Sequence, residues 1–430
     1  MTGRTFSSIY NLPLPSLPTS PYSMKSTLTL LGFLALSQTL WSSEAFDIWM
    51  DNLRSHFAKS SADSFWRARL SGTLDLEYHS FEGSPPSLID TTDNAHLQPR
   101  AILFLDIQAG KKIYAFGQAR IDNGFDPSNG DREFRLDEYF IRYSPFGDDS
   151  LNLQAGQFAT IVGQWQNRHL PWQNPLISAP LAYEQVTRIT DNSSFTYDFP
   201  GTEVSDKWLY NYNPIIWGPV YATGFAASGK RSKFEWAVEI KNAALTSRPE
   251  YWTLGYDDFD FPSYSARIAW KPDLRWTVGL SASEGPYFGP WQRSTLPRAW
   301  DPSRYKQTTF VVDASFEWRH LRIWSEFLQS EFLVPGTGYV DSSSAFVEAS
   351  YKLDTRISIA ARLNTQRFSS LENQWGASVA WGEDQNRIDL GATLRLSAYS
   401  QLQVEVDLRD NKTGLIDMGT HFSSRFTLRF

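Results

Sequence analysis

The sequence contains no cysteine in its 430 residues. A disulfide framework, a cysteine-ligated zinc site and a cysteine nucleophile are therefore excluded. Apolar runs are also scarce, since only the stretch from Thr27 to Leu40 is strongly apolar. A helical membrane protein would show several runs of about 20 apolar residues, so the chain does not belong to that class. The net charge of −7 argues against a nucleic-acid-binding protein, which usually presents a basic face.

The single apolar stretch has the features of an export signal. It follows Met24-Lys25 and ends shortly before Ser43-Glu44-Ala45, so a basic start, an apolar run and small residues before a cleavage point occur in order. We predict a signal peptide over residues 1–45, with Met24 as an alternative start. A membrane anchor is the competing interpretation, but the run is short for a span. Residues 46–63 are expected to form a short periplasmic N-terminal segment.

Alternating patterns and aromatic residues are abundant in the rest of the chain. Phe, Tyr and Trp make up 15% of the sequence. From Trp66 onward, polar and apolar residues alternate with a period of two, as in segments 67–79 and 233–241. Because side chains alternate across a strand, such segments predict β-strands with one polar and one apolar face.

The predicted connections alternate between short turns and long loops. Tight polar turns occur at 110–111, 144–149 and 352–355, among others, whereas the longest connection covers 160–216. Strands of a soluble sandwich usually have about five or six residues, and most of these are longer. Short turns at one end and long loops at the other are typical of a transmembrane β-barrel of the bacterial outer membrane. Aromatic residues near strand ends suit the girdles of such barrels.

We therefore predict an all-β fold: a transmembrane antiparallel β-barrel over residues 64–430 with about sixteen strands. Segment 374–382 also alternates and is expected to form a hairpin within a loop. If it spans the membrane instead, another strand must lie within 160–216, and the total becomes eighteen. The predicted strands are 66–81, 97–108, 112–122, 134–144, 150–159, 217–228, 232–243, 263–271, 274–284, 307–318, 320–331, 343–353, 355–367, 387–396, 400–410 and 420–430.

The chain ends on an alternating strand that closes with Phe430. A terminal Phe in this position resembles the C-terminal assembly signal of outer-membrane barrels. The expected partners are therefore outer-membrane lipid and the barrel assembly machinery, with no nucleic acid among them. A monomer and a homotrimer both fit the pattern.

One segment carries a more specific resemblance. Leu136 to Tyr143, a Pro-Phe-Gly turn and Leu153 to Phe158 resemble the strand–turn–strand of the phosphate-selective porin O- and P-like family. Gly163-Gln164-Trp165 and the pair Arg168-His169 resemble the start of that family's long third loop. The resemblance implies an outer-membrane porin whose third loop, 160–216, folds inward. Phosphate-specific members are associated with a ladder of arginines and a lysine cluster, whereas this chain mixes Arg with Asp and Glu.

The predicted function is a water-filled channel for passive diffusion of small hydrophilic solutes, which needs no cofactor. Inward strand positions carry more cations than anions, so we expect a mild preference for anionic solutes. The alternative is that the arginines only neutralise neighbouring carboxylates. The expected pore-lining and constriction residues are Arg120, Glu138, Arg142, Arg168, His169, Glu184 and Arg188.

No catalytic or metal-binding constellation stands out in the sequence. The six His residues are far apart and a G-x-S-x-G motif is lacking, so we predict no enzyme and no metal site. Asp257, Asp258 and Asp260 in loop 244–262 offer oxygen atoms that suit calcium, but such a run is more commonly a solvated loop. Two other interpretations compete with the channel. One is a surface barrel for adhesion or structure, and the other is a secreted carbohydrate-binding β-protein.

Overall fold

The computed structural model describes most of the predicted barrel. The described residues are 44–63, 65–83, 89, 91, 93–122, 133–191, 212–255, 259–296, 298, 300–372, 376–411 and 418–430. Nearly all of the predicted signal peptide lies outside these residues, so it stays a prediction. Asp257 and Asp258 of the candidate calcium loop also lie outside them. Within the described ranges, no helix is long and apolar enough to cross a membrane.

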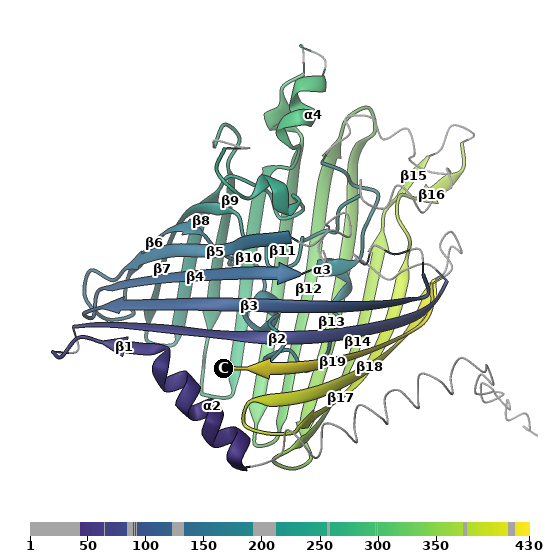
Figure 1. Ribbon diagram of the computed structural model, residues 1–430. Helices are drawn as coiled ribbons and strands as arrows, with labels where there is room; N and C mark the ends of the chain where they lie inside the picture. The colour runs from purple at the N-terminus through teal and green to yellow at the C-terminus, as the bar shows by residue number, and fades with distance from the viewer. Residues whose placement is uncertain are drawn as a thin grey trace, which may run out of the picture.

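Sixteen antiparallel strands of the described chain form one closed barrel (Figure 1). Each strand pairs with the next one of the ring, and the barrel closes where the last strand pairs with the first. The predicted architecture and the count of sixteen are confirmed. The strands are β2 (Trp66–Gly83), β3 (Ala95–Ala109), β4 (Ile113–Asp122), β5 (Glu133–Tyr143), β6 (Asn152–Gln157), β7 (Thr223–Arg231), β8 (Phe234–Lys241), β9 (Ser263–Trp270), β10 (Trp276–Pro286), β11 (Lys306–Trp318), β12 (Leu321–Val334), β13 (Gly338–Lys352), β14 (Ile357–Phe368), β17 (Gln385–Arg395), β18 (Ser400–Asn411) and β19 (Met418–Arg429).

The alternation seen in the sequence places polar side chains inside the barrel and apolar ones outside. On β2, the side chain of Leu74 is 47% exposed on the outer surface, whereas the neighbouring Thr73 is only 7% exposed on the inner face. Val238 and Leu390 are likewise exposed on the outer face. This is the distribution that a lipid-facing wall around a polar lumen requires.

Segment 374–382, expected to form a hairpin within a loop, contributes one strand of such a hairpin, and the other strand precedes the segment. β15 (Ser370–Glu372) pairs with β16 (Ser378–Ala380), and these two strands form a separate small sheet. The other long loops contain short helices: η1 (Trp165–Arg168), α3 (Leu181–Glu184), η3 (Pro249–Tyr251), α4 (Pro290–Thr295) and η4 (Pro302–Arg304).

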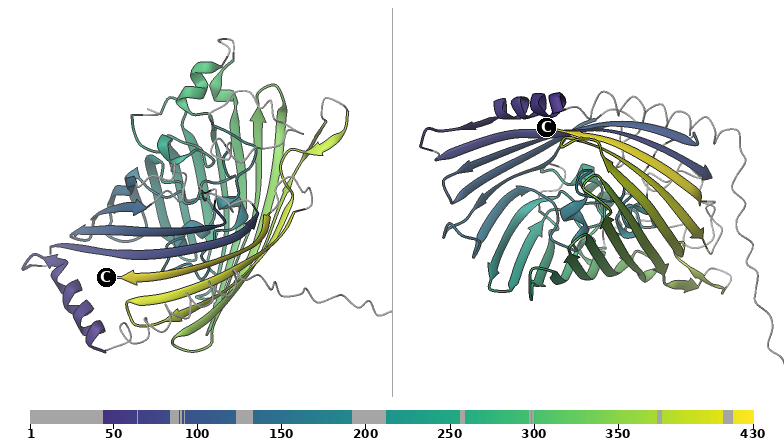
Figure 2. Two further views of the ribbon diagram at one scale, coloured as in Figure 1. Left: turned by 45° about the vertical axis from the view of Figure 1, so that its right-hand side comes forward. Right: turned by 90° about the horizontal axis from the view of Figure 1, so that it is seen from below.

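The N-terminal segment packs at the end of the barrel that carries the short turns. α2 (Glu44–His56) lies outside the wall near the C-terminus (Figure 2). The Tyr399 hydroxyl donates a hydrogen bond to Asp51 in this helix. After α2, β1 (Ala58–Ser60) pairs with β2.

The loop between β6 and β7 folds into the barrel (Figure 2). We call residues 158–222 the inward loop; its residues 158–191 and 212–222 are described. Its apolar side chains pack inside the barrel with the loops that follow β8 and β10, and with inner residues of β11 to β14. Burial of these side chains removes apolar surface from water and stabilises the loop in the lumen. The inward-folded third loop is thus confirmed as part of the fold.

Candidate pore constriction

The inward loop is anchored first to the inner face of β12. The backbone N–H groups of Gln164 and Trp165 each donate to Glu326 Oε1 at 2.8 Å. The Tyr183 hydroxyl donates to Glu326 Oε2 at 2.6 Å. Burial, and then the neighbouring Glu326 charge, raises the pKa of Tyr183 well above its ordinary value, so the phenol stays protonated as the donor.

Gly163 allows the loop to approach β12 this closely. Its backbone φ of +76° lies in the left-handed region that favours glycine. A Cβ atom at this position would also collide with the Tyr183 hydroxyl. The Gly-Gln-Trp sequence that follows β6 therefore suits a tight turn into the lumen.

Arg168 provides a second anchor, on β13. Its Nη1 donates to Glu348 Oε1 at 2.5 Å, and the Glu348 side chain is fully buried. The guanidinium carbon lies 4.3 Å from the centre of the Trp324 ring on β12. Arg168 therefore joins the loop to two neighbouring strands by an ion pair and a cation–π contact.

A third anchor holds residues 177–179 and α3 against β14, β17 and β18. Arg362 Nη2 donates to the Ser178 hydroxyl at 2.6 Å and to the Ser178 carbonyl at 3.0 Å. Glu405 accepts hydrogen bonds from the Ser178 N–H and hydroxyl. Arg387 donates to Glu184 in α3 and to the Ala179 carbonyl. Because these charged groups are buried and paired, the loop is fixed at this wall rather than free in the lumen.

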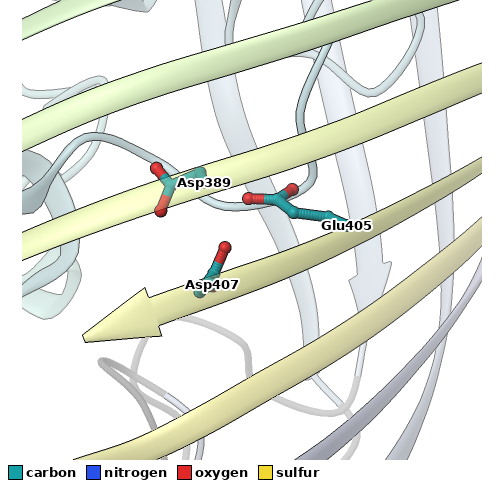
Figure 3. A group of neighbouring side chains, drawn as sticks. All are labelled: Asp389, Glu405 and Asp407. Carbon is teal, nitrogen blue, oxygen red and sulfur yellow. The ribbon is translucent and has the colours of Figure 1, made fainter. Parts of the chain in front are cut away.

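Three carboxylates meet behind this anchor, on β17 and β18 (Figure 3). Asp389, Glu405 and Asp407 have carboxylate oxygens within 4.8 Å of one another. Nε of Arg362 and Nε of Arg387 each lie 2.7 Å from an Asp389 oxygen. The guanidinium groups already compensate the carboxylate charge, and Glu405 is engaged by the loop. The cluster therefore does not fit a cation and instead belongs to the loop anchor.

The facing wall, on β3 to β5, carries a different set of charges. Arg120 Nε lies 2.7 Å from Asp137 Oδ2 and 3.3 Å from Asp122 Oδ2. Glu138 Oε1 accepts a hydrogen bond from the Ala159 N–H at 3.3 Å, where the inward loop leaves the wall. Arg142 donates from Nε and Nη2 to Gln154 Oε1 at 3.0 and 2.9 Å.

A bulge in β5 brings in residues that the sequence analysis missed. The pairing of β4 with β5 shifts between Gln118 and Ala119, so that Asp137 is the extra residue. Asp137 and Arg135 therefore face the lumen together with Glu138. Strict alternation from Glu138 would have placed both on the lipid side. The sequence does carry a signal for the shift, because the apolar residues Phe134 and Leu136 are out of phase with Tyr139 and Ile141.

The predicted site residues are thus divided between two walls. Arg120, Glu138 and Arg142 lie on β4 and β5, whereas Arg168 and Glu184 contact the strands across the lumen. His169 joins the two sets, since its Nε2 lies 2.6 Å from the Tyr221 hydroxyl, which also accepts from Gln118 at 3.3 Å. Burial, and then the Glu138 charge, raises the pKa of Tyr221 well above its ordinary value. Arg188 is buried within the inward loop.

The barrel also brings together two histidines that are distant in sequence. His79 on β2 and His421 on β19 have ring nitrogens 3.1 Å apart, and His421 Nδ1 lies 2.8 Å from Asp407 Oδ2. Their proximity follows from the closure of the barrel, and local sequence carries no signal for it.

Solved structures of bacterial outer-membrane proteins have the same barrel. OmpF of Salmonella typhi, in complex with daunomycin, matches with a TM-score of 0.56 and 11% identity, over 86% of this chain and 100% of that one. The outer-membrane channel DcaP of Acinetobacter baumannii matches with a TM-score of 0.56 and 12% identity, over 86% and 99%. An anion-selective porin from Comamonas acidovorans matches with a TM-score of 0.51 and 10% identity, over 85% and 99%.

At these identities the similarity shows the fold alone: the chain has the barrel of the outer-membrane porins. No known family profile and no curated protein matches the sequence. The resemblance to the phosphate-selective porin O- and P-like family therefore stays a prediction.

Proposed function

We propose that this protein is an outer-membrane porin through which small hydrophilic solutes diffuse passively. The observation that carries the proposal is the inward loop, which is folded into a closed barrel and held by buried ion pairs. A polar lumen narrowed by a fixed loop is a diffusion channel with a defined cross-section. An adhesion barrel has no use for a rigid constriction of this kind.

The proposed path runs between the inward loop and the wall formed by β3 to β5. Arg168 and Arg387 are paired with carboxylates on the opposite side, so they contribute little net field to this path. Arg142 faces the lumen, and among the described residues no carboxylate lies within ion-pair distance of it. We propose a mild anion preference with Arg142 as its main source, and no phosphate-specific ladder of arginines.

Reconstitution in planar lipid bilayers tests the proposal. Discrete conductance steps are expected from the folded protein. Glu405→Gln should change the single-channel conductance, because the variant weakens the anchor of the loop that narrows the lumen. The matched control is Glu284→Gln, an exposed residue on the outer face that pairs with Lys306. A folded, membrane-inserted barrel without conductance steps would contradict the channel and favour the surface-barrel alternative.

A further inference from the structure

Five aromatic side chains form a continuous row on the inner wall, on the side of the short turns. We call this row the aromatic stripe. It consists of Phe104 on β3, Tyr114 and Phe116 on β4, Phe140 on β5 and Phe158 at the start of the inward loop. The ring centres are 6.2 Å apart between Phe104 and Phe116, 5.6 Å between Phe116 and Phe140, and 6.3 Å between Phe140 and Phe158. Tyr114 lies 6.0 Å from Phe140.

The stripe faces the lumen and not the lipid. Leu103, Leu105, Ile113 and Ile141 alternate with its members and are exposed on the outer surface. The rings of Phe104, Tyr114 and Phe116 remain partly exposed on the inner face. Single apolar side chains on a wet surface are common, but a contiguous row of them on a polar wall is typical of a ligand-binding surface. The row of rings therefore indicates a solute with an apolar face.

Polar groups lie along the same wall and offer both donors and acceptors. Asp106 accepts a hydrogen bond from the Tyr114 hydroxyl. The Arg142 guanidinium lies 5.6 Å from the Tyr114 ring centre and 5.2 Å from that of Phe140. Arg142 donates hydrogen bonds to Gln154. Glu138 is the inward-facing residue of β5 that precedes Phe140. A binding surface with aromatic faces and a few convergent polar groups is the usual composition of a small-molecule site.

We propose that the aromatic stripe is a binding track for neutral carbohydrates, an inference that rests on the proposed channel function. A pyranose ring has an apolar C–H face that stacks on an aromatic ring, and hydroxyl groups at its edge that both donate and accept. The carboxylates of Asp106 and Glu138 can accept from these hydroxyls, while Arg142 and Gln154 can donate to them. A sugar satisfies acceptors and donors together, whereas a solute that only accepts, such as an aromatic carboxylate, would donate to neither Asp106 nor Glu138.

The stripe leads to the constriction. Along β4 the inward positions change from aromatic at Tyr114 and Phe116 to the amide of Gln118, which contacts Tyr221 of the inward loop. The next inward side chains along β4, beyond this contact with the loop, are the charged Arg120 and Asp122. A sugar held on the stripe would therefore occupy the path just below the narrow region and reduce the ion current through it.

The experiment is a titration of single-channel current with maltotriose, using the full chain in planar bilayers. Maltotriose should block the current in a saturable way, whereas the open-chain polyol sorbitol should not. Tyr114→Ala with Phe116→Ala should raise the half-blocking concentration about tenfold, because two stacking faces are lost. The lipid-facing Tyr139→Ala on β5 is the matched control and should leave the block unchanged.

Phe104→Leu and Phe116→Leu provide a second pair of variants, since leucine keeps apolar bulk without a flat ring face. They should also weaken the maltotriose block, and their conductance steps report that the barrel has formed. Conductance without a maltotriose block, or equal effects of maltotriose and sorbitol, would overturn the carbohydrate track while leaving the channel intact. If benzoate blocks the current and maltotriose does not, the stripe binds aromatic acids and not carbohydrates. If the unaltered protein gives no conductance steps, the result would instead contradict the proposed channel function.

Discussion

Arg168 Nη1 lies 2.5 Å from Glu348 Oε1, and this contact joins the inward loop to the far wall of the barrel. The two residues are on η1 and β13, and Arg362 also pairs with Glu348, at 3.2 Å. Arg168 therefore acts as a structural tie, although its position in the loop also suits a selectivity residue. Among the described residues, Arg142 has no comparable carboxylate partner.

The first prediction concerns ion selectivity. Arg142→Gln should shift the reversal potential in a KCl gradient toward weaker anion preference, because it removes a cation whose charge is offset by no ion pair with the described residues. Arg168→Gln should shift the potential less and alter the conductance more, because it loosens the loop. A larger shift of the potential in Arg168→Gln than in Arg142→Gln would contradict this assignment.

The second prediction concerns the loop anchor. Arg387→Met should destabilise the barrel by about 3–5 kcal/mol, since Glu184 and Asp389 would be left as buried charges without this partner. Lys306→Met breaks a pair in which the two side chains are 43% and 53% exposed, and should cost about 0–1 kcal/mol. Urea unfolding in liposomes measures both changes. Similar losses of unfolding free energy in the two variants would show that the buried ion pairs of Arg387 do not stabilise the barrel.

The third prediction concerns the orientation of the wall. Leu280→Arg places a charge on the outer face, where the leucine side chain is 54% exposed, and should destabilise the barrel by about 2–4 kcal/mol if that site is near the bilayer midplane. Thr277→Arg, on the lumen-facing side of β10, should be milder because the charge stays in water. Equal losses of unfolding free energy would mean that the assignment of the two faces is wrong.

The fourth prediction concerns the closure of the barrel. Ser424 on β19 is paired with Tyr78 on β2, so their Cα atoms are within the range that a disulfide can bridge. Ser424→Cys with Tyr78→Cys should form a disulfide under oxidising conditions, and the natural chain has no cysteine to interfere. The cross-link is read from migration on a non-reducing gel.

Ser424→Cys with Leu74→Cys is the control for this seam, because Leu74 is paired four residues away, with Leu428. It should remain uncross-linked. A disulfide in the control and none in the paired variant would place β19 in another register.

The period-two alternation, together with the order of short turns and long loops, determined the barrel, its sixteen strands and the direction of most side chains. Segment 374–382 is an example. Its alternation predicts strand structure, and the order of short turns and long loops places the segment within a loop, where its residues 378–380 form β16 and pair with β15. Local pattern is sufficient here because each strand must separate a lipid face from a polar face along its own length.

Only the tertiary structure decided which charges meet. The contact of His79 with His421 and the pairing of Arg168 with Glu348 join segments far apart in sequence. The bulge that turns Asp137 inward depends on the register between β4 and β5. The aromatic stripe depends on register too, since its members come from the neighbouring strands β3, β4 and β5 and from the start of the inward loop. Alternation states which face of a strand a residue occupies, but the neighbours across the wall and the lumen depend on register, closure and the path of the loop.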